Sequence, residues 1–342
     1  MYEVPMRNVV DPPVPHWLHY WAILTVAATV VLLPLGALVT TIRAGMADPV
    51  WPTTPWYLAV TPWQGLSVGF LIEHSHRLAG YVVGCLAIVL AVGSWVRSPR
   101  WLSWLGTAAL VAVSLQGILG GYRVRLNALL GPEMAAVHGV FGALVFSLLV
   151  SVAVLTGRPA GEALGEVEQR RFTRLSLLVI VAVLAQLAFG ALVRHTYLSF
   201  GPRLHLLGAF AVLAAVTWLA RAVRENPSAR KRLGWSVSVL VLFVVIQLIL
   251  GVEAWLSKFA QGFFLELQQA PTIPQAAVRT AHFLIGSCIL ASAVATLLLA
   301  RQSPSGWRTP GGEWKETATG SQPRLLPSTL HPAPSTHSEG RA

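Results

Sequence analysis

The sequence predicts an all-α polytopic membrane protein, with eight transmembrane helices arranged as two duplicated four-helix bundles. Of its 342 residues, 54% are hydrophobic and only 11% are charged, whereas soluble domains carry about 25% charged residues. The apolar residues form long runs of the ~20 residues that a bilayer-spanning helix needs. Short phrases of sequence also recur in the two halves of the chain. Together these observations exclude a water-soluble globular protein.

Eight segments are long and apolar enough to span a bilayer. The expected helices cover residues 17–42, 65–96, 101–122, 132–156, 174–194, 202–223, 233–257 and 276–300. They divide the chain into an N-terminal half, 17–156, and a C-terminal half, 174–300, joined by a cytoplasmic linker, 157–173. The Pro-rich segment 1–16 precedes them. The tail 301–342 is rich in Pro, Ser, Thr and Gly, and is expected to be disordered.

The distribution of Lys and Arg predicts the orientation in the membrane. Of 25 basic residues, 17 lie on the side that contains both termini and 7 lie on the opposite side, with Arg77 inside the second helix. Because positively charged loops stay in the cytoplasm, we expect a multi-pass inner-membrane protein with both termini cytoplasmic. The net charge of +11 therefore reflects membrane orientation, and we expect no nucleic-acid partner.

An internal repeat relates the two halves. Gly36-Ala37-Leu38-Val39 in the first helix matches Gly190-Ala191-Leu192-Val193 in the fifth. A glutamine followed four residues later by glycine occurs three times, at Gln116/Gly120, Gln186/Gly190 and Gln247/Gly251. Duplicated membrane halves commonly place their sites symmetrically.

Of the histidines inside the expected helices, four form a set with one member on each even-numbered helix, all toward the outer face: His76, His138, His205 and His282. A small residue follows each of them one turn later, at Gly80, Gly142, Ala209 and Gly286. Such residues either clear space for a flat macrocycle or mark close helix packing. The fourfold pattern favours bis-histidine haem ligation inside helical bundles. Zinc is disfavoured because no third protein ligand accompanies the histidines.

The most polar stretch inside a helix is Glu73-His74-Ser75-His76-Arg77. The i, i+3, i+4 spacing places Glu73, His76 and Arg77 on one face, with His74 turned away. Ionisable residues in a membrane helix usually mark function. The alternative is an interfacial Glu73–Arg77 ion pair. No acid accompanies His205 in the second half, so the two halves are chemically unequal.

These residues carry a resemblance to the haem A synthase family over roughly residues 17–300. The matching motifs are Glu73-x-x-His76-Arg77, Gln116-Gly117-x-x-Gly120-Gly121 through Val124-Arg125, Ala136-Val137-His138, Gly190-Ala191-Leu192-Val193-Arg194-His195, and, in the first loop, Ala44-Gly45-Met46-Ala47 with Trp51-Pro52-Thr53-Thr54. Many relatives have a cysteine pair in an outer loop. This chain has only Cys85 and Cys288, both in apolar runs.

The resemblance implies oxidation of the C8 methyl group of haem O to a formyl group, which gives haem A for terminal oxidases. It implies that His76 and His138 bracket the substrate haem O, while His205 and His282 ligate a resident haem b. Glu73 would orient water or stabilise a developing cation at the methyl carbon. The candidates for propionate binding are Arg77, Arg123, Arg125, Arg194, Arg203 and Arg279. Candidate protein partners are the haem O synthase and assembly proteins of the terminal oxidase.

Two other functions compete with this one. A di-haem b-type electron-transfer cytochrome would be better served by haems at different depths, and it leaves Glu73 unexplained. A secondary transporter would have helices broken near the midplane, yet Pro52, Pro132, Pro202 and Pro274 are all expected at helix ends. A haem O prenyltransferase is disfavoured because the only aspartates are Asp11 and Asp48, too few for Asp-rich diphosphate motifs.

Overall fold

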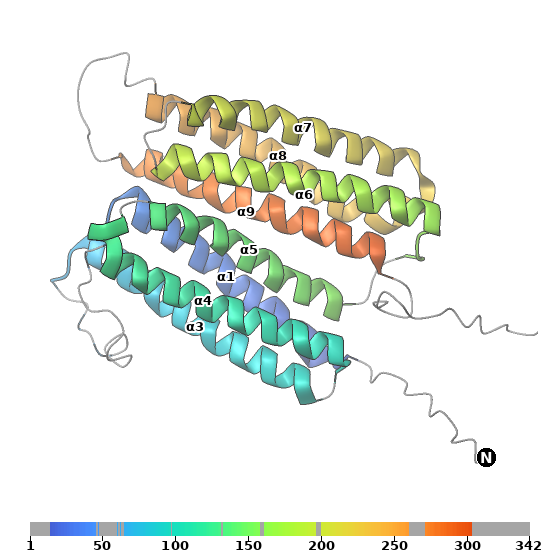
Figure 1. The fold of residues 1–342 in the computed structure, drawn as a ribbon, viewed down its shortest axis with the longest axis horizontal. Helices are drawn as coiled ribbons and strands as arrows, with labels where there is room; N and C mark the ends of the chain where they lie inside the picture. Colours follow the sequence, from blue (N-terminus) through green and yellow to red (C-terminus); the bar gives the residue numbers. More distant parts are fainter. Residues whose placement is uncertain are drawn as a thin grey trace, which may run out of the picture. The chain divides into compact units, whose positions relative to one another are not determined.

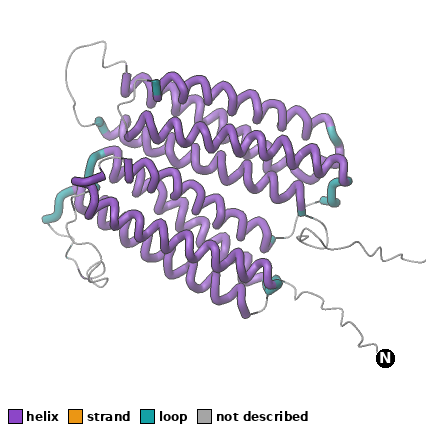
Figure 2. Tube along the Cα trace, viewed as in Figure 1, coloured by secondary structure: helices purple, strands orange, loops and turns teal. Residues whose placement is uncertain are grey.

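The computed structural model describes residues 14–45, 47, 60, 62, 65–96, 98–130, 133–157, 161–195, 200–259 and 271–302. The expected N-terminal segment lies mostly outside these residues, as do most of the first-loop motif and nearly all of the expected tail. The described chain is helical throughout, with short connections and no strand among the residues placed (Figure 2).

Eight helices account for the described part of the chain, and each is long and apolar enough to cross a membrane. They are α1 (His16–Thr41), α3 (Val68–Val96), α4 (Arg100–Leu130), α5 (Glu133–Thr156), α6 (Glu166–His195), α7 (Gly201–Glu225), α8 (Pro227–Phe259) and α9 (Ile273–Arg301). In lipid, a helix satisfies its own backbone hydrogen bonds, so apolar runs of this length form helices. The prediction of an all-α membrane protein is confirmed.

Several helices extend beyond the predicted apolar runs. Helix α6 begins at Glu166, so about half of the expected linker 157–173 is helical, and α8 begins at Pro227 rather than 233. Helix α4 continues past 122 to Leu130. The reason is physical: hydropathy locates the part of a helix inside the hydrocarbon core, whereas its polar end turns continue into the interface. Acidic residues at the start of α6, Glu166 and Glu168, also suit the positive N-terminal end of the helix dipole.

The helices pack as two rings of four (Figure 1). In the first ring, α3 and α5 each pack against α1 and α4; in the second, α7 and α9 each pack against α6 and α8. Each ring has its own apolar core, and a third cluster with Leu33, Phe146 and Ala291 joins the rings along the seam of α1, α5 and α9. Large apolar side chains such as Val92, Val181 and Ile249 face outward, as a lipid environment requires. The common origin of the two rings by duplication stays a prediction.

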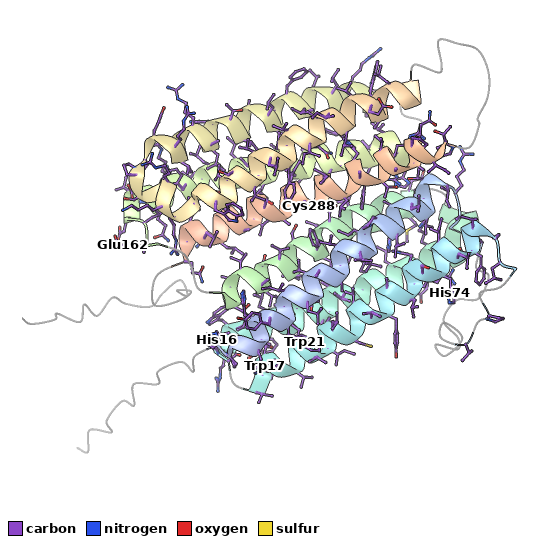
Figure 3. The ribbon with its side chains drawn as sticks, turned by 180° about the vertical axis from the view of Figure 1, so that it is seen from behind. His16, Trp17, Trp21, His74, Glu162 and Cys288 are labelled. Atoms are coloured by element: carbon purple, nitrogen blue, oxygen red, sulfur yellow. The ribbon has the colours of Figure 1, made fainter. Side chains whose placement is uncertain are left out.

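The two ends of the bundle contain different parts of the chain. Helix α1 begins and α9 ends at the same end, together with the short turns that follow α3, α5 and α7 (Figure 1). The opposite end, where α3, α5, α7 and α9 begin, is called here the histidine end. In Figure 3, His74 lies at the histidine end, whereas His16 and Trp17 lie at the other end.

Pro202 and Pro274 lie in the first turns of α7 and α9, as expected, whereas Pro52 and Pro132 lie outside the described residues. Pro34, which that expectation did not cover, lies inside α1. Because proline has no N–H, it removes the helix hydrogen bond to the carbonyl of Val30. The backbone ladder of α1 is therefore interrupted two residues before Gly36.

Candidate functional site

Each of the four helical histidines packs against a glycine of a neighbouring helix. The pairs are His76 on Gly36, His138 on Gly120, His205 on Gly190 and His282 on Gly251. A Cβ built on these glycines would lie 2.6, 3.1, 3.1 and 3.2 Å, respectively, from the imidazole Cε1 atom. Any larger residue would push the ring away. The recurrent glycines of the sequence are thus the seats of the four imidazoles.

The recurrent glutamines hold the same histidines. Gln116 Nε2 donates to the main-chain oxygen of His138 at 3.0 Å and lies 3.3 Å from its ring Nε2. Gln186 Nε2 donates to the main-chain oxygen of His205 at 2.8 Å. These glutamines precede their glycines by four residues, so both share one helix face. The sequence showed this phrase as a repeat, but its role in holding histidine requires the helix pairing.

Gln247 completes the set of glutamine contacts. Its Nε2 atom lies 3.2 Å from the Nε2 atom of His282. The first helix has no glutamine at the matching place, where Leu32 stands instead. His76 is hydrogen-bonded there by the main chain of Leu32.

The small residue one turn after His76, His138 and His282 packs against a neighbouring helix. Gly142 faces Gln116 Nε2 and Gly286 faces Gln247 Nε2, at 3.0 and 3.3 Å from an added Cβ. In α7 the residue in this role is Gly208, which faces Gln186, and not Ala209. The clearance that the sequence suggested for a macrocycle is occupied by glutamine, because the i, i+4 face is the face that packs on the neighbouring helix. Close helix packing, the alternative considered, is therefore correct.

All four imidazoles have one ring nitrogen left over. The Nδ1 atoms of His76, His138, His205 and His282 are buried and have no hydrogen-bond partner among the residues described. A metal-ligating histidine uses one nitrogen for the metal and has the other held by an outer group. A held imidazole with a free second nitrogen fits this requirement. The donor set therefore fits the axial ligation of haem iron.

The histidines form two pairs, one in each ring. The His205 and His282 rings lie 6.1 Å apart between centroids, with planes at 72°. With metal–imidazole bonds of about 2 Å, two ligands of one iron have centroids about 6 Å apart. In the first ring His76 lies within electrostatic range of His138. No group of three or more metal-binding side chains occurs in the described chain.

Glu73 lies beside only one of these pairs. It is 3% exposed, and its Oε1 atom accepts a hydrogen bond from Arg77 Nη2 at 2.8 Å. The ion pair that the sequence suggested at an interface is therefore buried. His74, which was expected to face away from His76, is fully buried and stacks on Phe70.

The candidate arginines separate into those near the histidines and those elsewhere. Arg123 lies within electrostatic range of Glu73 and His76. Arg279 precedes His282 by one turn and is half-buried, whereas Arg203 is exposed. The side chain of Arg125 lies outside the described residues.

Arg194 connects the two rings at the histidine end. From α6 it donates to the carbonyl of Ala37 at 2.6 Å and to Thr41 Oγ1 at 2.8 Å, both on α1. Its guanidinium carbon also lies 5.6 Å from the centroid of the Phe283 ring on α9. Arg123 and Arg279 lie within its electrostatic range. Positive charge from both rings therefore gathers beside the four histidines, as an anionic ligand would require.

Sequence comparisons relate this chain to known proteins. Residues 58–201 match the COX15-CtaA family model, described as cytochrome oxidase assembly protein. The chain is 26% identical over 182 residues to a protein named Heme A synthase from Alkalihalophilus pseudofirmus, covering 52% of this chain and 60% of that relative. It is 28% identical to the Heme A synthase of Halalkalibacterium halodurans, covering 51% of this chain and 58% of the relative.

A longer alignment covers a larger share of the chain. The Heme A synthase of Bacillus licheniformis is 24% identical over 276 residues, covering 71% of this chain and 87% of the relative. The chain thus spans less than two thirds of the first two relatives and most of the third. The family match across the first histidine pair and these alignments show that the chain is similar to the COX15-CtaA family and to proteins named Heme A synthase.

Proposed function

We propose that the chain is a haem A synthase, which oxidises the C8 methyl group of haem O to a formyl group and so gives haem A for terminal oxidases. The observation that carries the proposal is the pair of held histidines in each ring, with a buried carboxylate beside only one pair. The similarity to the COX15-CtaA family and to proteins named Heme A synthase supports the same function. The proposed enzyme is an oxidoreductase acting on a CH group of its haem substrate.

The unequal halves suggest which pair binds which haem. We assign His76 and His138 to the substrate haem O, because Glu73 lies one turn before His76. We assign His205 and His282 to a resident haem b, because the residue three before His205 is Pro202. A permanent electron-transfer cofactor needs axial ligands and no neighbouring acid. Haem iron supplies one-electron redox chemistry when bound.

The protein side chains then have distinct tasks. The imidazoles would hold the haem iron, while Glu73 would orient water or stabilise positive charge that develops at the methyl carbon. Arg77 holds the Glu73 carboxylate in place through their 2.8 Å ion pair. Arg123, Arg194 and Arg279 supply the positive charge that haem propionates need. Conversion of methyl to formyl with water as the oxygen source releases four electrons and four protons, so the reaction needs an electron acceptor, and a haem b bound at His205 and His282 would supply that redox chemistry.

We also propose that the histidine end faces the outside of the inner membrane. The basis is the excess of basic residues, 17 of 25, on the side of the termini. Reporters fused after Gln302 test this orientation: a cytoplasmic reporter should be active there, and activity of a periplasmic reporter would overturn it. The haem O synthase and oxidase assembly proteins remain the proposed protein partners.

Chromatography of extracted haems tests the function. Cells that produce haem O but lack haem A synthase should accumulate haem A only when this chain is co-expressed. Unchanged haem O together with a bis-histidine haem spectrum would overturn the proposal in favour of a di-haem electron-transfer cytochrome. The spectrum of the same purified protein also tests the transporter alternative, because a transporter would have no haem absorption.

A further inference from the structure

Three of the four histidines are supported by a neighbouring helix in the same way, and His76 departs from that pattern. Each pattern consists of a histidine, the glycine on which its ring lies, and the residue four positions before that glycine. This last residue is called here the bracing residue. The bracing residues are Leu32 for His76, Gln116 for His138, Gln186 for His205 and Gln247 for His282.

Three bracing residues hold their histidine with a side-chain amide. Gln116 contacts both the main-chain oxygen and the ring of His138. Gln186 donates to the main-chain oxygen of His205, and Gln247 contacts the ring of His282. Each amide therefore ties the histidine-bearing helix to its neighbour beside the ligand.

Leu32 occupies the same place without an amide. Its Cδ1 atom lies 3.9 Å from a Cβ built on Gly80, which follows His76 by one turn. This contact corresponds to those of Gln116 on Gly142 and Gln247 on Gly286. The apolar side chain fills the space but donates no hydrogen bond. The contact that Leu32 makes with the His76 ring is a main-chain hydrogen bond.

The backbone of α1 differs as well. Pro34 lies between Leu32 and Gly36 and removes one bond of the helix ladder. Among the helices that carry a bracing residue, α1 has a proline in its interior, whereas the described parts of α4, α6 and α8 have none after the first residue. His76 thus packs on a helix whose ladder is interrupted and is held by fewer hydrogen bonds.

We propose that Leu32 makes His76 the exchangeable ligand of the substrate haem, so that haem O enters and haem A leaves by release of His76 while His138 keeps its hold. This inference rests on the proposed function and deepens it. An enzyme must release its product, whereas a resident cofactor must stay. The amide-braced pair, His205 and His282, suits the haem that stays, and the pair with one unbraced ligand suits the haem that turns over.

The first test adds the missing amide. Purified Leu32→Gln protein, loaded with haem O, should lose that haem to an excess of a haem-scavenging protein about twofold to tenfold more slowly than wild type, the range that one hydrogen bond supplies. The size-matched control Leu32→Met should lose haem O at the wild-type rate. Low-spin absorbance of the bound haem is followed in both. Equal rates for the Gln and Met variants would overturn the proposal.

A reverse test keeps the proposal falsifiable if Leu32→Gln does not fold. Gln116→Leu removes the brace of His138 and should speed loss of haem O, whereas Gln247→Leu should speed loss of haem b from the second ring. Unchanged rates in both variants would overturn the proposal. Failure of the proposed function would give a different result. The exchange rates would still depend on the bracing residue, but neither the wild type nor any variant would make formyl haem. Absence of haem from the wild-type first ring would overturn both.

Discussion

Glu73→Gln is the substitution that best separates chemistry from packing at this site. Glutamine keeps the length of the side chain and an oxygen that accepts a hydrogen bond from Arg77, but it removes the negative charge. If that charge acts in the reaction, formyl haem should form about 10²–10³-fold more slowly, as when one well-placed electrostatic group is lost. Haem O should still bind, because His76 and His138 remain.

The burial of the ion pair also determines how much stability the substitution costs. The side chains of Arg77 and Glu73 are only 11% and 4% exposed, so the small value of an exposed pair, about 0–1 kcal/mol, does not apply. Removing one member of a buried pair costs about 3–5 kcal/mol of stability. The retained amide oxygen makes the cost of Glu73→Gln smaller than that range. A loss of activity alone therefore does not identify a role in the reaction.

A double variant resolves the two effects. Glu73→Gln combined with Arg77→Met removes both charges and so avoids a buried arginine that has lost its carboxylate. Haems extracted from cells that supply haem O are separated by chromatography, and the thermal midpoint of each purified variant is measured. If Glu73 serves chemistry, haem O or a hydroxylated intermediate accumulates in both variants, even where the double variant regains stability. Near-normal haem A in either variant would refute the reasoning and leave Glu73 with a structural role.

Three further predictions concern a glycine that seats a histidine, a haem ligand, and an arginine at the other end of the bundle. Gly36→Ala places a Cβ 2.6 Å from His76 Cε1 and should abolish low-spin haem O binding, whereas Gly84→Ala, with no atom within 4 Å, should bind normally; equal spectra would contradict the packing argument. His282→Ala should remove the low-spin bis-histidine spectrum of haem b from the purified protein, and its survival would place the resident haem elsewhere. Arg232→Ala removes donors to the carbonyls of Leu299, Gly161 and Gln302. The free energy of unfolding should fall by about 1–3 kcal/mol or more, measured as a lower thermal midpoint. An unchanged midpoint would show that these bonds are replaced by water.

The sequence by itself determined the membrane class, the eight helices and the set of ligand candidates. Apolar runs are a direct signal, because a bilayer forces any segment of that length and composition to satisfy its backbone as a helix. The common depth of His76, His138, His205 and His282 also follows from counting along helices of fixed rise. The Gln-x-x-x-Gly phrase was also visible in the sequence as a repeat. Hydropathy did not locate the ends of α4, α6 and α8, since polar end turns lie outside the apolar signal.

Only the tertiary structure decided which side chains meet between helices. Spacing along one helix places residues on a face, but it does not say which neighbouring helix covers that face. Hence the seating of His76 on Gly36, the packing of Gln116 on Gly142 and the reach of Arg194 from α6 to α1 came from the packing of the rings. The burial of Glu73 also depends on that packing, because the environment of a charge is set by residues distant in sequence. The same physical reason makes Leu32 informative: the missing amide has meaning only once α1 is seen beside His76.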